Sequence, residues 1–116
     1  MKLPNAEHAV IEEAKITRYL LNLDSRDGHG KAKFFLAHGF SLARWYELEE
    51  TLLWHAVAHN VVDVASGVDG TLYVIEGVAN TPDGRSPYIR SIWFIESGQE
   101  IPRLTSAYPR SRRRSQ

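Results

Sequence analysis

The fold of this chain is decided by residues 60–108, which read NVVDVASGVDG (60–70), TLYVIEGVANTPDG (71–84), RSPYIRSIWFIESGQE (85–100) and IPRLTSAY (101–108). Near Asn60 the spacing of the apolar residues changes from a helical to a strand-like period. Four strands are therefore predicted, over residues 61–66, 71–79, 87–96 and 101–108. The segments between them are rich in Gly, Asp and Pro and are short enough for hairpins, so the sheet is expected to be antiparallel.

Three helices are expected before this sheet. Residues 12–22 open with two glutamates, which suit a helix N-terminus, and then place apolar residues at helical spacing. A second helix is predicted over residues 31–38, with Gly39 as a left-handed cap, and a third from Ser41 as N-cap to about His59. Helices followed by strands predict an α+β fold, with N-terminal helices packed on one face of a roughly four-stranded antiparallel sheet.

The bulk composition limits the class of protein. At 116 residues the chain has the usual size of one domain. It contains no cysteine, its first residues lack the apolar run of a signal peptide, and its apolar runs are far shorter than the ~20 residues that cross a bilayer. These features predict a single cytoplasmic domain over residues 1–109 that does not associate with membranes.

The formal net charge of zero conceals an uneven distribution. Residues 1–100 carry nine basic and fourteen acidic side chains, whereas the last sixteen residues carry five arginines and no acid, so −5 is balanced by +5. Residues 110–116 are predicted to form a basic, disordered tail. An alternative, that the tail contacts nucleic acid phosphates, stays open.

Alternation along the strands groups the side chains that share a face. In the third strand the two groups are Tyr88, Arg90, Ile92 and Phe94 on one face, and Ile89, Ser91, Trp93 and Ile95 on the other. In the last strand, Leu104, Ser106 and Tyr108 are expected to share a face. The pattern does not say which face is exposed, so the polar and aromatic residues are either a binding surface or part of the core.

The turn before the second helix, Gly28–Lys31, resembles part of a phosphate-binding loop. The full nucleotide-binding pattern fails because Ala32 stands where Ser or Thr is required. A helix N-terminus with Lys31, Lys33 and nearby His29 is still expected to bind one phosphate of a polymer, the alternative being a solvated basic turn.

His55 and His59 are four residues apart at the end of the third predicted helix and share one helix face. A metal site is not predicted, because Asp63 is the one evident further ligand and it lies beyond the helix. Histidines bonded to carbonyl groups near the helix end are expected instead.

Three segments resemble a bacterial family of small stand-alone domains: KAKFF (Lys31–Phe35), RSIW (Arg90–Trp93) and SAYP (Ser106–Pro109). The resemblance extends over residues 3–109, and that family is similar to the C-terminal toxin domains of polymorphic and contact-dependent secretion toxins. Those domains resemble the barnase, EndoU, colicin and RelE group of ribonucleases, which share N-terminal helices and a four-stranded antiparallel sheet. The resemblance implies a toxin-like endoribonuclease of a toxin–antitoxin system, with RNA as substrate and a small antitoxin protein as partner.

The expected reaction needs no metal and no other cofactor: the ribose 2′-hydroxyl attacks the adjacent phosphate and leaves a cyclic phosphate. It requires a base, an acid and donors that stabilise the charge on the phosphorane. The resemblance and the residue types together predict four roles: His29 as the base; Lys31 and Arg90 as a phosphate clamp; Ser91, Ser106 and Tyr108 as orienting or proton-donating hydroxyls; and Lys33, Arg103 and Trp93 as substrate-binding residues, with Trp93 stacked on a base.

The alternative function is a non-catalytic module of the same fold that binds a protein or a nucleic acid. In that case Ser106 and Tyr108 are packed as ordinary strand residues and no cluster forms near Lys31. The two functions therefore differ in a geometric expectation, the convergence of Lys31 with Ser106 and Tyr108.

Overall fold

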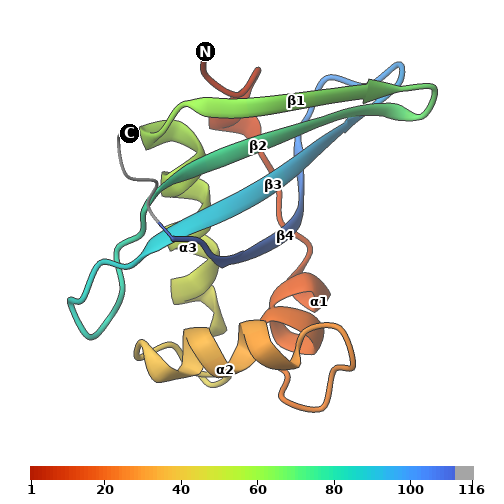
Figure 1. The fold of residues 1–116 in the computed structure, drawn as a ribbon. Coiled ribbons are helices and arrows are strands. Elements are labelled where there is room, and N and C mark those ends of the chain that lie inside the picture. Colours follow the sequence, from red (N-terminus) through yellow and green to blue (C-terminus); the bar gives the residue numbers. More distant parts are fainter. Residues whose placement is uncertain (112–116) are drawn as a thin grey trace.

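In the computed structural model, which describes residues 1–111, the chain forms a helical layer and one sheet (Figure 1). The elements, in chain order, are η1 (Ala6–His8), α1 (Glu13–Lys15), η2 (Ile16–Leu20), α2 (His29–Ala37), α3 (Trp45–Ala58), β1 (Val61–Gly67), β2 (Gly70–Val78), β3 (Tyr88–Glu96) and β4 (Arg103–Pro109). Every predicted helical segment and strand is present, with ends that differ by a few residues. The predicted α+β class is confirmed.

The sheet has the strand order β1-β2-β3-β4, and each strand is antiparallel to the next, as predicted. The turn between β1 and β2 is tight, because Gly67 pairs directly with Gly70. Gly70 has φ 149°, and a Cβ atom there would lie 2.3 Å from the carbonyl oxygen of Ile95. Only glycine fits this position, which explains why the turn is built around it.

The helices cover one face and one edge of the sheet. Figure 1 shows α3 behind the sheet, where it packs against β2 and β3, while α1 and α2 lie beside β4. The covered face carries the buried side chains of Ile75, Ile89 and Trp93, whereas Arg90 and Phe94 on the opposite face are partly exposed. This assignment of the two faces is what alternation alone left open. No helix within residues 1–111 is long and apolar enough to cross a membrane.

The first helical segment differs from the plain α-helix that was predicted over residues 12–22. After the short α1, η2 is a π-helix: the Leu21 N–H donates to the carbonyl oxygen of Ile16, five residues earlier, at 2.9 Å. π-Helical turns are rare and occur frequently at functional sites. Here the π-helical turn carries Tyr19, whose hydroxyl reaches β4.

A bulge in β4 interrupts the alternation that the sequence predicted. Trp93 pairs with Leu104, and the residue before it on β3, Ile92, pairs with Ser106. Thr105 therefore has no partner on β3 and is the extra residue of the bulge, so Ser106 and Tyr108 lie on the open face. A bulge of one residue moves the following side chains to the other face. The prediction that Leu104 shares a face with Ser106 and Tyr108 was therefore wrong, since Leu104 joins the core and the two hydroxyl residues leave it.

Contacts with the folded body extend past the predicted domain end at Pro109. The Arg110 N–H donates to the carbonyl oxygen of Tyr88 at 3.1 Å, and the Arg110 guanidinium lies 3.2 Å from the carboxylate of Glu76. Arg110 thus belongs to the folded body rather than to the tail. The remainder of the predicted tail, residues 112–116, lies outside the described residues.

Candidate functional site beside strand β4

A hydrogen bond joins Tyr19 and Ser106, which are 87 residues apart in the sequence. Their hydroxyl oxygens are 3.0 Å apart, and either group can be the donor. Tyr19 comes from the π-helical turn and Ser106 follows the bulge of β4, so both local irregularities contribute to this contact. Ser106 is 8% exposed and Tyr19 is partly buried.

Lys31, in the first turn of α2, lies between two tyrosine rings. Its Nζ atom is 5.1 Å from the ring centroid of Tyr19 and 5.6 Å from that of Tyr108. Both distances are in the range in which an ammonium is attracted to an aromatic ring. Its hydrogen bond to the carbonyl oxygen of Asp27 is long, at 3.4 Å, and no carboxylate within residues 1–111 forms an ion pair with it. The ammonium is therefore available to an anionic ligand.

Arg90 is held on the open face of the sheet by a carboxylate. Its Nε and Nη2 atoms donate to Oε2 of Glu76 at 2.8 and 2.6 Å, and its Nη1 donates to the Tyr108 hydroxyl at 3.4 Å. The Glu76 side chain is 9% exposed and also pairs with Arg110. Charge-assisted bonds of this kind fix the guanidinium plane, so Glu76 orients Arg90 towards Tyr108.

These contacts define a group of five residues, which we name the β4 cluster: Tyr19, Lys31, Arg90, Ser106 and Tyr108. A depression of about 410 Å³ opens beside it, lined by Asp27, Gly30, Lys31, Tyr108 and Pro109. The structure thus brings together four of the predicted site residues from α2, β3 and β4. Tyr19 was not predicted, because its position in a helical row of apolar residues is typical of the core.

The phenol of Tyr19 is electrostatically unusual. Burial raises its pKa, but the neighbouring Lys31 ammonium, the hydrogen bond with Ser106 and the charge of Lys15 together outweigh burial. The pKa of Tyr19 is therefore lowered from its ordinary value of 10.0. A tyrosine with a lowered pKa is more readily converted to the phenolate, the form that accepts a proton in acid–base chemistry.

Ser91 and Trp93 do not belong to this site, which corrects two of the predicted assignments. Both are fully buried on the face of β3 that α3 covers. The Trp93 indole N–H donates to Ser91 Oγ at 2.9 Å, and Ser91 Oγ is 2.8 Å from Nδ1 of His55. Trp93 cannot stack on an RNA base because its ring is core, and the Ser91 hydroxyl has partners in the core.

His55 completes this buried network. Its Nε2 atom is 3.1 Å from the carbonyl oxygen of Gly77, which accepts only, so Nε2 carries the proton and Nδ1 accepts from the Ser91 hydroxyl. The pKa of His55 is lowered from 6.5 to about 4, mainly by burial and also by the nearby His59, against the opposing hydrogen bonds to the backbone of Gly77 and Ile89. The histidine is therefore neutral in the folded protein at neutral pH.

The stability of the protein is expected to decrease as the pH falls from 6.5 towards 4, the interval between the ordinary and the lowered pKa of His55. In this interval the unfolded chain binds a proton that the folded protein does not. The free energy of unfolding should fall by about 2 kcal/mol between pH 7 and pH 5 from this group alone.

Denaturant unfolding of the wild type and of His55→Gln at both pH values measures this contribution. The variant should be less stable at pH 7 but lose less stability on acidification, whereas a variant of the exposed His8, His8→Gln, should behave as the wild type. Equal losses in the wild type and His55→Gln would show that His55 is not the group that titrates.

His29 and Lys33 lie outside the β4 cluster. Nδ1 of His29 donates to the carbonyl oxygen of Leu23 at 2.7 Å, so the imidazole closes the turn before α2. His29 is exposed and does not line the depression beside Lys31. Lys33 is also exposed, and within residues 1–111 it makes no contact with the cluster. The predicted base, His29, therefore lies apart from the β4 cluster.

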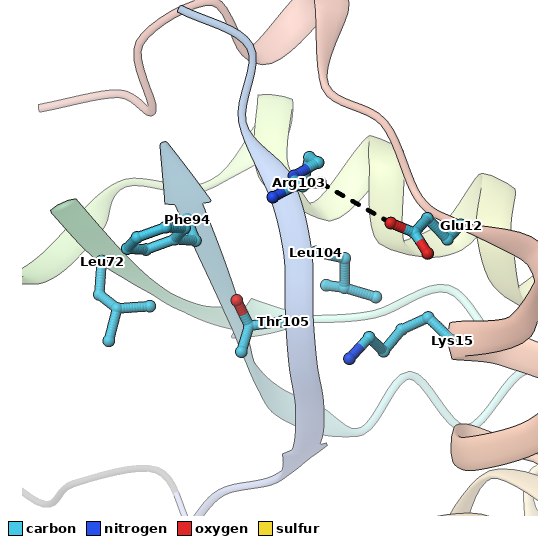
Figure 2. A pocket seen from close by; sticks show the side chains of 7 residues that line it. All are labelled: Glu12, Lys15, Leu72, Phe94, Arg103, Leu104 and Thr105. Atoms are coloured by element: carbon cyan, nitrogen blue, oxygen red, sulfur yellow. Dashed lines mark ion pairs between the residues drawn. The ribbon is translucent and has the colours of Figure 1, made fainter. Parts of the chain in front are cut away.

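Arg103 lines a second depression, of about 360 Å³, near the beginning of β4 (Figure 2). It pairs in register with Phe94, and its Nη1 atom is 3.8 Å from Oε1 of Glu12. Lys15 lines the same depression and lies 5.3 Å from the Tyr19 ring centroid. Arg103 is therefore not part of the β4 cluster. The depression that it lines adjoins the cluster, because Lys15 and strand β4 contribute to both.

The two helix-end histidines bond to the sheet, rather than to the helix carbonyls that were expected. Nε2 of His59 is 2.8 Å from the carbonyl oxygen of Val78. Nε2 of His55 is 3.1 Å from the carbonyl oxygen of Gly77. Within the part of the chain that the structure describes, no three His, Asp or Glu side chains are placed to hold one metal ion. The donor set that the i, i+4 spacing suggested does not form there.

Comparison with known protein families gives a match over nearly the whole chain. A domain family described as a domain of unknown function, DUF6883, matches residues 2–111, which is nearly the whole chain. No curated protein and no solved structure matches the chain significantly.

Proposed function

The chain belongs to the DUF6883 family, a domain of unknown function, and from this premise we propose that it is a toxin-like endoribonuclease that cleaves RNA without a metal ion. One observation carries the proposal. Lys31 converges with the hydroxyl groups of Tyr19, Ser106 and Tyr108, which come from separate segments of the chain. The alternative, a non-catalytic binding module, was expected to have no cluster near Lys31, so the convergence favours the enzyme.

Binding of the scissile phosphate is the first task of such a site. Lys31 presents an ammonium that pairs with no carboxylate of residues 1–111 and lies beside an open depression, and Arg90 presents a guanidinium that Glu76 holds in place. The pentacoordinate phosphorane carries more negative charge than the tetrahedral ground-state phosphodiester. Fixed cations therefore stabilise the transition state more than the substrate, which is the condition for catalysis.

Proton transfer is the second task, and the proposal assigns it to the two tyrosines. The Tyr19 phenolate accepts the proton of the ribose 2′-hydroxyl, whose oxygen attacks the phosphorus. The bond from phosphorus to the 5′-oxygen then breaks, and the Tyr108 hydroxyl donates a proton to that oxygen. The products are a 2′,3′-cyclic phosphate and a 5′-hydroxyl. Ser106 positions Tyr19 through the hydrogen bond between them, and Arg90 stabilises the phenolate left on Tyr108.

The wider biological part of the proposal rests on the family resemblance. The resemblance implies a small antitoxin protein as the inhibitor of the enzyme, and the proposed cytoplasmic location rests on the composition of the chain, which contains no cysteine. An edge strand that carries the site, as β4 does, is a natural contact for such a protein, because binding there would cover Lys31 and Tyr108 together.

Incubation of the purified protein with total RNA in EDTA tests the proposal. The wild type is expected to cleave RNA and leave cyclic phosphate ends, and Tyr108→Phe is expected to cleave roughly 10- to 1,000-fold more slowly because the acid is missing. Tyr46→Phe, which removes an exposed phenol on α3, is the matched control and should cleave as the wild type.

Three outcomes contradict the proposal or part of it. Absence of cleavage of every RNA offered, together with absence of toxicity in cells, would favour the non-catalytic binding module. Loss of wild-type cleavage in EDTA would show that a metal ion is required. Equal rates for Tyr108→Phe and the wild type would remove Tyr108 from the mechanism.

A further inference from the structure

The depression beside Arg103 has two different walls. Figure 2 shows Leu72 and Phe94 on the sheet side of β4, and Glu12 and Lys15 on the side of α1. Its volume of about 360 Å³ is in the range of small-molecule sites, although it is open to solvent.

The sheet-side wall is apolar and includes an aromatic ring. Leu72 pairs with Phe94 across β2 and β3, and Phe94 pairs with Arg103 across β3 and β4, so the three side chains form one row across the open face. Phe94 is partly exposed, in contrast to the neighbouring Trp93, which is core. The row offers a ring and a guanidinium next to each other.

The opposite wall is cationic. The ion pair between Arg103 and Glu12 is long, at 3.8 Å, and both side chains are half exposed or more, so it is easily exchanged for another anion. Lys15 has no carboxylate partner within residues 1–111, and its Nζ atom points towards β4 in Figure 2. Lys15 can therefore bind a phosphate group directly, and Arg103 can do so in exchange for Glu12.

The depression adjoins the β4 cluster. Thr105 lines it, and the next residue, Ser106, bonds to Tyr19. Lys15 lines it as well and lies 5.3 Å from the Tyr19 ring centroid. Thr105 and Tyr108 are three strand residues apart, which is about 10 Å, so a polymer with its phosphate at Lys31 extends directly into this space.

We propose that the depression between Phe94 and Lys15 binds the nucleotide of single-stranded RNA that neighbours the cleaved phosphate, with its base stacked on Phe94 and a backbone phosphate between Arg103 and Lys15. The proposal rests on the proposed function for the position of the cleaved phosphate. The strand has to be single because a base reaches the Phe94 ring only when it is unpaired and unstacked from its neighbours.

A substitution of Glu12 should change RNA affinity in the opposite direction to substitutions of Phe94 and Arg103. The Glu12 carboxylate competes with a phosphate for Arg103, so removal of its charge is expected to strengthen binding, while removal of the ring or of the guanidinium weakens it. Arg44 and Glu47 provide a matched control, because they form a similar exposed ion pair, also at 3.8 Å, outside the depression.

The experiment measures binding of a fluorescein-labelled hexauridylate with 2′-fluoro groups, which lacks the attacking hydroxyl, by anisotropy. Phe94→Leu is expected to bind at least about fivefold more weakly than the wild type, and Phe94→Tyr about as well, since the ring is kept. Arg103→Ala should bind about fivefold more weakly and Glu12→Gln about twofold more tightly. Arg44→Ala and Glu47→Gln should bind as the wild type.

The outcomes separate this site from the proposed activity. Wild-type affinity in Phe94→Leu and Arg103→Ala overturns the site, as does an equal loss in Arg44→Ala and Arg103→Ala, which would indicate nonspecific charge attraction. If wild-type protein cleaves no RNA but Phe94→Leu and Arg103→Ala weaken hexauridylate binding, the binding site stands and the cleavage proposal falls.

Discussion

Replacement of Tyr19 by phenylalanine is expected to lower the rate of RNA cleavage by about 10²–10⁴-fold while the protein stays folded. In the proposed reaction the phenolate of Tyr19 removes the proton from the ribose 2′-hydroxyl, and phenylalanine has no atom that can accept it. The initial rate on a labelled RNA, with a thermal melt of the same sample, measures the effect. The melt is needed because the substitution also removes the hydrogen bond to Ser106, a loss of about 1 kcal/mol.

Ser106→Ala separates the two effects of the Tyr19 substitution. It removes the same hydrogen bond but keeps the phenol, so the two variants should lose similar stability and very different amounts of activity. Equal loss of activity in both would mean that Tyr19 acts only by holding η2 against β4.

The pH dependence of the rate gives a second readout. A base acts in its deprotonated form, so the wild-type rate should rise with pH until the pKa of Tyr19 is reached. Burial raises that pKa, but Lys31, Ser106 and Lys15 lower it by more, so the rise should end below the usual range of a tyrosine. Tyr19→Phe should lack this rise.

Replacement of Lys31 by alanine is expected to lower the cleavage rate by about 10²–10³-fold, the usual effect of removing one preorganised donor to a developing negative charge. Lys31 lies between the rings of the two tyrosines that exchange protons in the proposed reaction, 5.1 and 5.6 Å from their centroids. The loss should fall mainly on kcat, because the phosphorane carries more charge than the bound phosphodiester.

Lys33→Ala is the matched control for this variant. It removes the same charge from the same helix, two positions further on and exposed to solvent, and it should cleave at nearly the wild-type rate. Lys31→Arg should recover only part of the activity, since a planar guanidinium does not reproduce the position of an ammonium. Similar losses in Lys31→Ala and Lys33→Ala would show that the chain uses its general charge rather than a specific clamp.

The strands, their order and most helix boundaries are determined by local features of the sequence. The change of hydrophobic period near Asn60 marks the start of the sheet, and short turns rich in Gly, Asp and Pro allow only antiparallel neighbours. Alternation also placed Arg90 on the opposite face of β3 from Ser91 and Trp93. It did not show which face is exposed, because both faces of β3 carry large apolar side chains: Ile92 and Phe94 on one, and Ile89, Trp93 and Ile95 on the other.

That choice was decided by packing. α3 covers the face with Ile89, Ser91 and Trp93, and His55 from α3 supplies the partner that makes a buried Ser91 tolerable. A buried hydroxyl without a partner is costly, so the face that α3 can satisfy becomes the core. Ser91 and Trp93 were consequently predicted at the site although they are buried, since no sequence pattern shows which helix will meet which face.

The sequence by itself thus determined the α+β fold, the antiparallel sheet and the residue types from which a site beside β4 is built. Only the tertiary structure decided that Tyr19 joins Lys31 there, that His29 does not, and that Ser106 leaves the core while Leu104 enters it. The physical reason lies in two local irregularities. The π-helical turn rotates the side chains that follow it by a fraction of a helical turn, and the β-bulge moves those that follow it to the other face of the sheet. Both arise from contacts between segments far apart in the chain, and no local period records them.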